Sequence, residues 1–151
     1  MTDEPIIHYL NSDLDLVASV PLADLAAELE SRGVFPLHVE QFDDGLWHST
    51  LERDDCDHTE PDANIAEILT AIEALPPAAM ETWNACTKRE FNVGYDCGDE
   101  PWAFNQGLSN ETLRRMAECG ATFRLTLYPY RRKELPEDET RTEGHTPPDA
   151  D

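Results

Sequence analysis

The feature that most constrains the fold of this chain is residues 89–129, which read REFNVGYDCGDEPWAFNQGLSNETLRRMAECGATFRLTLYP. Apolar and polar residues alternate at both ends of this stretch. A period of two is typical of a strand with one buried face. Gly98, Pro101 and Gly107 interrupt the middle, where a loop is expected. The stretch therefore predicts a strand, a long loop, a helix and a second strand.

The helix in this stretch has well-marked ends. Ser109 can accept hydrogen bonds from the free backbone N–H groups of a first turn, and Glu111 suits the positive end of the helix dipole. Leu108 and Leu113 have the spacing of a hydrophobic staple. Gly120 can adopt the left-handed conformation that ends a helix. The pattern therefore predicts a helix between Ser109 and Gly120.

The two strands that flank this helix are each expected to be half-buried. Their apolar positions are Phe91, Val93 and Tyr95 in the first strand and Phe123, Leu125 and Leu127 in the second. Both strands alternate instead of being apolar throughout, so they favour an antiparallel sheet with one face open to water over a doubly wound parallel sheet.

The same patterns predict the preceding half of the chain. A strand is expected over about residues 10–19, and a helix follows from Pro21 to Gly33. A second strand over residues 35–39 contains Pro36, which indicates an edge strand or a bulge. The turn at residues 43–45 predicts a hairpin to a third strand with Trp47, Ser49 and Leu51 on one face.

A second long helix is expected to follow an acidic loop. Thr59 is its expected cap, and Pro61 suits its first turn. Its apolar stripe is Ile65, Ile68, Leu69, Ile72 and Leu75. Two prolines end it, and residues 78–86 add a short helical turn that carries Trp83.

The predicted order is β-α-β-β-α-β-α-β, which defines an α+β fold. We expect a two-layer sandwich with a mainly antiparallel sheet and the helices on one face. The first six elements match the split βαβ, ferredoxin-like arrangement, to which a helix and a strand are appended. At 151 residues, the chain is expected to form one globular domain over residues 1–130. Residues 131–151 are acidic, contain three prolines and are expected to form a disordered tail.

The net charge of −21 argues against nucleic-acid binding through a basic face, because contacts to phosphates need clustered Lys and Arg. Three interpretations of this charge stay open. It can reflect the solubility bias of an acidic or salt-adapted proteome, a negative face for a basic protein partner, or a decoy of the DNA phosphate array.

The sequence also indicates the cellular location of the protein and the redox state of its cysteines. No apolar run reaches the roughly 20 residues of a membrane helix, and the sequence MTDEP does not resemble a signal peptide. A cytoplasmic protein without membrane association is therefore expected. Cys56, Cys86, Cys97 and Cys119 form no CxxC pair, so we expect reduced thiols and no disulfide framework.

The chain resembles a group of small bacterial domains of unknown function. The matching residues are Trp47 in the strand after the hairpin and Leu108, Ser109, Glu111, Leu113, Ala117 and Gly120, followed by FRLTLY. The resemblance covers roughly residues 10–128 and departs in the second strand, which lacks the Pro-Thr turn of that group. It implies the fold and no activity.

The loop after the strand at residues 91–95 is the main candidate binding site. Trp102 and Phe104 are its expected anchors, because aromatic side chains dominate interface energetics, and Asp96, Asp99 and Glu100 are the expected polar rim. The alternative is that both aromatic rings fold back and plug the core. We expect a non-enzymatic protein-binding module, of an immunity or regulatory type, whose partner is a basic protein.

Metal binding and catalysis are the weaker alternatives. Cys56 and His58, among Asp54, Asp55 and Asp57, offer metal ligands, although their spacing is not that of a structural zinc site. Cys97 or Cys119 could complete a ligand set with His38 or His48 only if the fold brought them together. A small hydrolase or metal-dependent enzyme would use Asp96, Cys97 and one of these histidines, but acidic neighbours work against a reactive thiolate. No cofactor is expected.

Overall fold

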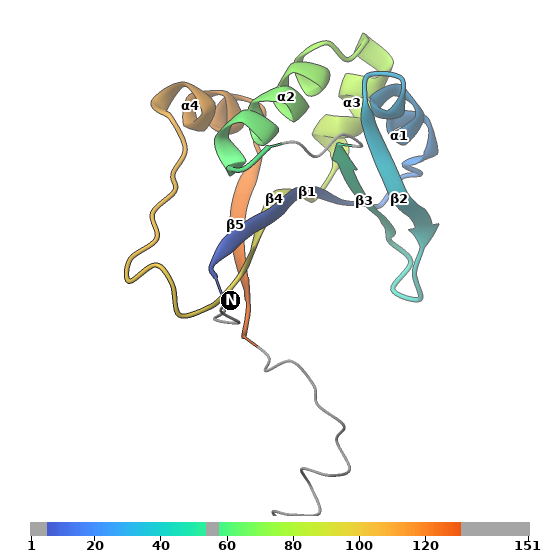
Figure 1. The fold of residues 1–151 in the computed structure, drawn as a ribbon. Coiled ribbons are helices and arrows are strands. Elements are labelled where there is room, and N and C mark those ends of the chain that lie inside the picture. The colour runs from blue at the N-terminus through green and yellow to red at the C-terminus, as the bar shows by residue number, and fades with distance from the viewer. Residues whose placement is uncertain (1–5, 54–57, 131–151) are drawn as a thin grey trace, which may run out of the picture.

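The computed structural model describes residues 6–53 and 58–130 (Figure 1). The expected tail at residues 131–151 and the candidate ligands at residues 54–57, which include Cys56, lie outside the described residues. The described residues form an α+β fold with five strands and four helices. In chain order these are β1 (His8–Ala18), α1 (Ala23–Glu30), β2 (Val34–Gln41), β3 (Trp47–Arg53), α2 (Pro61–Glu73), α3 (Pro77–Ala85), β4 (Lys88–Asp96), α4 (Asn110–Glu118) and β5 (Thr122–Tyr128).

The sheet is mixed and mostly antiparallel, with the strand order β2-β3-β1-β4-β5. β1 lies between β3 and β4 and is antiparallel to both, and β2 is antiparallel to β3. β5 is parallel to β4, which corrects the expectation that both strands of residues 89–129 belong to an antiparallel arrangement. The reason is that α4 carries the chain back before β5 begins, as a parallel connection requires.

The helices all lie on one side of the sheet and leave the other face open (Figure 1). The predicted apolar positions of β1 and β4 fill the space beneath them, since Leu14, Leu16, Phe91 and Val93 are all at most 1% exposed. The apolar stripe of α2 packs on the same side and is buried. The alternation of β1 and β4 and the helical stripe of α2 are therefore confirmed.

β2 is a protected edge strand, as Pro36 indicated. The strand is last in the sheet order, and its register with β3 shifts between Pro36 and His38. The expected apolar face of residues 35–39 is wrong at Leu37, which is 58% exposed. A register irregularity turns side chains out of strict alternation, so the simple pattern fails there.

Helix ends are partly as predicted. The Ser109 hydroxyl accepts a hydrogen bond from the Thr112 N–H at 3.1 Å, so the predicted cap of α4 is confirmed. α2 instead begins after Glu60, which provides no side-chain cap, so the prediction of Thr59 as cap is wrong. Pro61 at the first position lacks an N–H and lowers the need for a cap there. Leu113 is 49% exposed and contributes little to the core.

Arg89 joins the ends of α3 and α4. Its guanidinium donates hydrogen bonds to the carbonyls of Trp83 (2.9 Å), Cys86 (3.1 Å), Asn84 (3.3 Å) and Gly120 (3.1 Å). These carbonyls belong to the end of α3 and to the turn after α4, where a helix leaves carbonyl groups short of N–H partners, although the Trp83 carbonyl also accepts from the Cys86 N–H at 3.2 Å. One cation therefore satisfies the polar ends of two helices.

Gly120→Ala should lower the free energy of unfolding by about 1–2 kcal/mol, because a side chain strains the left-handed backbone. Gly120 has φ +77°, and an added Cβ would lie 2.9 Å from Arg89 Nη2. Urea unfolding measures the loss. Gly107→Ala is the matched control, since a Cβ there meets nothing within 4 Å and Gly107 has no positive φ. Equal stability of the two variants would contradict this account of the turn.

Candidate functional site

The candidate binding segment connects β4 to α4 and comprises residues 97–109, here called the aromatic loop. Its first residue is fixed to the sheet, because the Cys97 N–H donates to the Tyr128 carbonyl at 3.0 Å. The Glu100 carbonyl accepts from the Ile7 N–H at 2.8 Å, which ties the next part of the loop to the chain before β1. At its end, the Ser109 N–H donates to Asp62 Oδ1 at 2.8 Å. The aromatic loop is therefore held at both ends.

Phe104 and Gln106 anchor the middle of the aromatic loop to the core. The Phe104 ring meets the Tyr95 ring edge-to-face at a centroid distance of 5.8 Å, and it packs half-buried against the core. The Tyr95 hydroxyl donates to Gln106 Oε1 at 2.8 Å, and Gln106 Nε2 donates to the Thr59 carbonyl at 2.9 Å. For Phe104 the structure matches the core-plug alternative more closely than the role of a binding anchor.

Trp102 projects from this anchored loop into solvent and is 97% exposed. Asp99 and Glu100, just before it, are exposed as well. Asp96 is half-buried at the end of β4 and lies 3.6 Å from His8 Nε2. Of the five candidate binding residues, the structure places Trp102, Asp99 and Glu100 on the outer surface of the aromatic loop. Phe104 packs against the core, and Asp96 is the last residue of β4.

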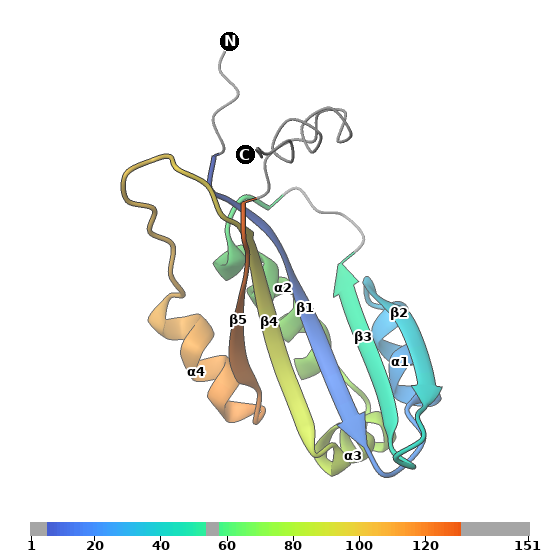
Figure 2. The same cartoon turned by 90° about the horizontal axis from the view of Figure 1, so that it is seen from below.

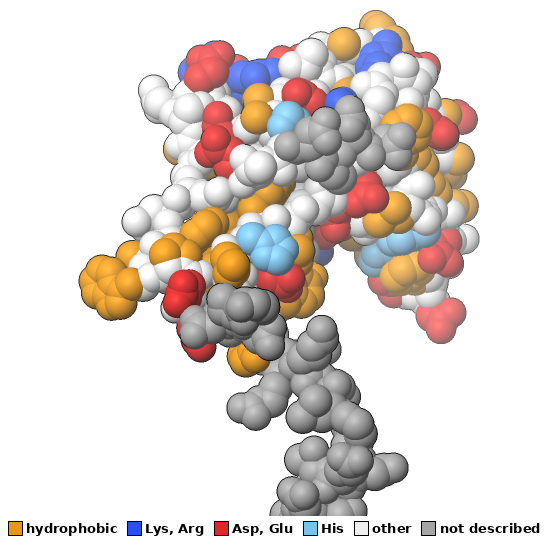
Figure 3. Space-filling view, in the orientation of Figure 1, with side chains coloured by type: hydrophobic (Ala, Val, Ile, Leu, Met, Phe, Trp, Pro, Cys, Tyr) orange, Lys and Arg blue, Asp and Glu red, His pale blue; other side chains and the backbone are white. Residues whose placement is uncertain are grey.

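β5 adds an apolar surface that the sequence pattern did not identify. Phe123, Leu125 and Leu127 alternate with polar residues as predicted. The prediction that this apolar face is buried is wrong, because the three side chains are 48%, 52% and 56% exposed. α4 and the aromatic loop lie beside β5 at the sheet edge and leave its apolar side chains partly uncovered (Figure 2). Hydrophobic side chains accordingly gather on the side of the molecule that carries the loop and β5 (Figure 3). Alternation shows which face is apolar and cannot show what covers it.

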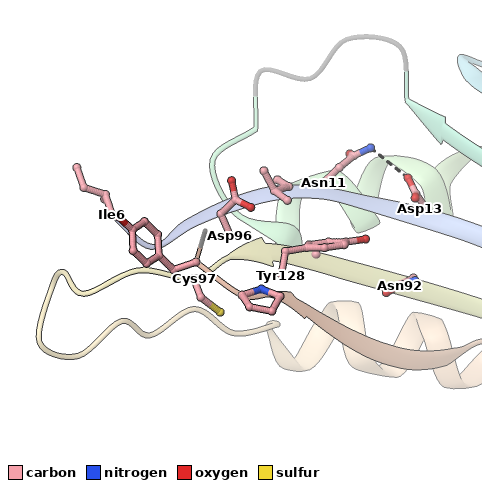
Figure 4. A pocket seen from close by; sticks show the side chains of 11 residues that line it. Ile6, Asn11, Asp13, Asn92, Asp96, Cys97 and Tyr128 are labelled. Carbon is pink, nitrogen blue, oxygen red and sulfur yellow. Dashed lines mark hydrogen bonds between the residues drawn. The ribbon is translucent and has the colours of Figure 1, made fainter. Parts of the chain in front are cut away.

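A pocket of about 620 Å³ lies on the open side of the sheet at the end of β4 and β5. Asp96 and Cys97 line one end of it and Asn92 lines the other, while Tyr128 lies between them (Figure 4). A Cβ on Gly94 would come within 3.3 Å of the Tyr128 ring, so glycine allows this ring to lie on β4. The pocket therefore contains two residues of the predicted catalytic alternative.

The histidine that this alternative requires is not His48. Asp96 pairs with His8 at one end of β1, whereas His48 pairs with Val17 near the other end. At about 3.3 Å per residue, His48 lies roughly 30 Å from Asp96 and Cys97 along the sheet. The only described histidine with a contact to this pair of residues is His8, on Asp96.

His38 and His48 belong to a separate cluster at the β2–β3 hairpin. The Phe42 ring stacks on the His48 ring at 3.9 Å and on the His38 ring at 6.3 Å. His48 also lies 3.2 Å from Asp44. The metal set of Cys97 or Cys119 with these histidines is therefore not assembled.

His58 pairs with Glu67 Oε2 at 3.2 Å instead of facing a second candidate ligand among the described residues. The described residues contain no group of three or more His, Cys, Asp or Glu side chains that could hold a metal ion. Cys119 is half-buried, and burial raises the pKa of its thiol. Of the helices in the described part of the chain, none is long and apolar enough to cross a membrane.

Asp13, which lines the far end of the pocket, belongs to a carboxyl pair with Glu52 that the sequence analysis missed. Asn11 Nδ2 donates to Asp13 Oδ1 at 3.1 Å and to Glu52 Oε1 at 2.6 Å. Burial, the nearby charges of Glu52 and Asp15 and a hydrogen bond with Glu52 raise the pKa of Asp13 to about 6. β1 and β3 bring these carboxyl groups together across the sheet, which no local sequence pattern reveals.

Asp13→Asn should stabilise the protein at pH 8 and have no such effect at pH 4. The folded-state pKa is above the usual value near 4, so stability from the protonated carboxyl is present below about pH 4 and is lost as pH rises through about 6. Asparagine keeps a neutral side chain at every pH, and the expected gain at pH 8 is about 1–3 kcal/mol.

Urea unfolding of wild type and variant at pH 4, 6 and 8 measures this gain, and carboxyl groups that titrate alike in both proteins cancel in the difference. Asp24→Asn on α1 is the control and should show no gain that grows with pH. A gain from Asp13→Asn that is the same at all three pH values would contradict the assignment.

Comparisons with protein-family models, with curated proteins and with solved structures found no match for this chain.

Proposed function

We propose that this chain is a non-enzymatic protein-binding module, of an immunity or regulatory type, that binds a basic protein through its aromatic loop and acidic surface. The observation that carries the proposal is the 97% exposure of Trp102 on a loop whose base is fixed. A large indole that contributes nothing to the core has its greatest energetic value when a partner covers it.

The size of the exposed indole supports an anchoring role. A tryptophan side chain can bury about 150–250 Å², so covering it completely contributes about 4–6 kcal/mol before the costs of association. Ordering a mobile loop would consume part of this gain. Here the contacts of Phe104 and Gln106 already hold the loop, so less is lost on binding.

The charge of the surface supports a basic partner. Asp99 and Glu100 are exposed beside Trp102, and the full chain carries a net charge of −21. Charges of this kind steer a basic protein toward the loop and raise its association rate, especially at low salt. The association rate should therefore fall as ionic strength rises.

The hydrolase alternative has one supporting observation, which is the pocket shared by Asp96 and Cys97. Its histidine would be His8, which contacts Asp96 and comes from the start of β1. We rank it second because, among the described residues, no hydrogen bond to the Cys97 thiol indicates a base that could activate it.

Photo-crosslinking from residue 102 tests the proposed function. One variant of the full chain carries p-benzoylphenylalanine in place of Trp102, and a second variant carries it in place of Leu37. Each variant is mixed with an extract of the source cells and illuminated. Leu37 is the control because it is 58% exposed on the opposite edge of the sheet. We expect a basic protein to crosslink to residue 102 and not to residue 37. Equal crosslinking from both positions, or none from residue 102, would refute the proposal.

We also propose that the first four strands and the helices between them form a ferredoxin-like arrangement. The order β2-β3-β1-β4 with antiparallel neighbours supports a ferredoxin-like arrangement, to which α4 and β5 are appended. An experimental structure in which β1 does not lie between β3 and β4 would contradict it. The resemblance to small bacterial domains of unknown function stays a prediction.

A further inference from the structure

β5 has an edge that no described strand covers, because it is the last strand in the sheet order. The Tyr128 carbonyl accepts a hydrogen bond from Cys97, so the backbone groups of Tyr128 point toward β4. Backbone groups alternate in direction along a strand. Those of Phe123, Leu125 and Leu127 therefore point away from β4, toward the uncovered edge.

The same three residues carry the exposed apolar side chains. They pair in register with Phe91, Val93 and Tyr95 of β4, so they lie on the helix-bearing face of the sheet. Each is about half exposed. Leu113, on the neighbouring α4, is 49% exposed as well. The edge of β5 thus combines free backbone donors and acceptors with an apolar surface beside them.

The two edges of the sheet differ in protection. Proteins usually shield edge strands with proline, bulges or charged side chains, because an open edge is a template for another strand. β2 has Pro36 and a register shift. β5 has neither, and its one charged residue, Arg124, points to the open face, where it pairs with Glu90 at 2.8 Å. Of the two edge strands described, β2 therefore has such protection and β5 does not.

We propose that the edge of β5 binds an extended segment of the partner protein as a sixth strand. This inference rests on the proposed function and names the segment that the partner supplies. Strand addition uses the free backbone groups for affinity and alternate side chains for selectivity. The segment has apolar residues at every second position, which cover Phe123, Leu125 and Leu127.

Charge indicates lysine or arginine at one end of this segment. The register pairs Asp96 with Tyr128, so the aromatic loop leaves the sheet at the C-terminal end of β5. Asp99 and Glu100 are exposed there, and neither forms an ion pair with another described residue. An antiparallel segment would place its N-terminal end beside these carboxylates. A second copy of this chain would instead bring another net charge of −21 to the same surface.

Amide hydrogen exchange with synthetic peptides tests the inference. The probe is acetyl-Lys-Lys-Thr-Val-Thr-Val-Thr-Val-amide, and the matched control has two glutamates in place of the lysines. With the lysine peptide, exchange of the Phe123, Leu125 and Leu127 amides of the full chain should slow by about tenfold or more, because strand addition makes protected backbone hydrogen bonds. The glutamate peptide should protect them far less.

Leu125→Lys should abolish the protection at residues 123 and 127, because a charge in the apolar surface opposes strand addition. Leu37→Lys on the opposite edge is the control and should leave the protection unchanged. Both positions are more than half exposed, so both variants should fold, and an unchanged Trp83 indole signal in the NMR spectrum checks this.

The outcomes separate this inference from the proposed function. If the lysine peptide leaves the three amides unprotected while residue 102 still crosslinks to a basic protein, the strand inference is refuted and the proposed function stands. If the peptide protects the amides and residue 102 crosslinks to nothing, the proposed function is refuted. Protection without any peptide, in a species with twice the mass of 17.0 kDa, would show that a second copy occupies the edge and would overturn the inference.

Discussion

Trp83→Ala should lower the free energy of unfolding by about 3–5 kcal/mol, as is typical when a fully buried aromatic side chain is removed. Trp83 is fully buried, and its indole N–H donates to the Cys119 carbonyl at 2.9 Å. Alanine removes the indole from the core and leaves both a cavity and an unpaired carbonyl at the end of α4. Urea unfolding at pH 7 measures the loss.

Two controls separate the causes of this loss. Trp83→Phe keeps a ring in the core and loses the hydrogen bond to Cys119, so it should cost about 1–3 kcal/mol. Trp102→Ala removes the same kind of side chain from a 97% exposed position and should change stability by less than about 0.5 kcal/mol. A loss below about 1 kcal/mol for Trp83→Ala would contradict its place in the core.

Local patterns predicted the parts of the fold that local physics determines. The alternation of Phe91, Val93 and Tyr95 predicted a strand with one face toward the core, because successive strand residues point to opposite faces of the sheet. Ser109 and Gly120 marked the ends of α4, because capping depends on a few adjacent backbone groups. These interactions span only a few residues and can be recognised in the sequence.

The parts that failed depend on distant segments. Phe123 and Leu125 alternate as clearly as the residues of β4, yet they are about half exposed because α4 lies beside β5 and does not cover it. The parallel direction of β5 likewise follows from the path of α4. Asp13 and Glu52 meet only because β1 and β3 are neighbours in the sheet. None of these arrangements leaves a periodic signal.

Part of the candidate site could be predicted, and part of it could not. The sequence identified the aromatic loop but could not distinguish Trp102 from Phe104, which lie two residues apart and have opposite environments. The difference arises from Tyr95, whose ring holds Phe104 and leaves Trp102 without an equivalent contact in the described structure. A loop without regular periodicity gives no rule for the direction of its side chains.

Trp102→Ala should weaken binding of the partner by at least about 30-fold, since interface tryptophans that anchor a complex contribute about 2 kcal/mol or more. The loss should appear mainly as faster dissociation, because removal of an apolar anchor changes contacts made after encounter. Replacing Asp99 and Glu100 by their amides should instead slow association and reduce its dependence on salt. Surface plasmon resonance with the partner identified by crosslinking measures both rates.

If Trp102 anchors a basic partner protein, two variants of this chain should differ in their dissociation constants for that partner. Isothermal titration calorimetry measures binding of the partner to Trp102→Ala and to Leu37→Ala, two variants that each lose one exposed apolar side chain. We expect the first variant to bind at least about 30-fold more weakly than the second. Dissociation constants that agree with each other and with the wild-type value would contradict the claim.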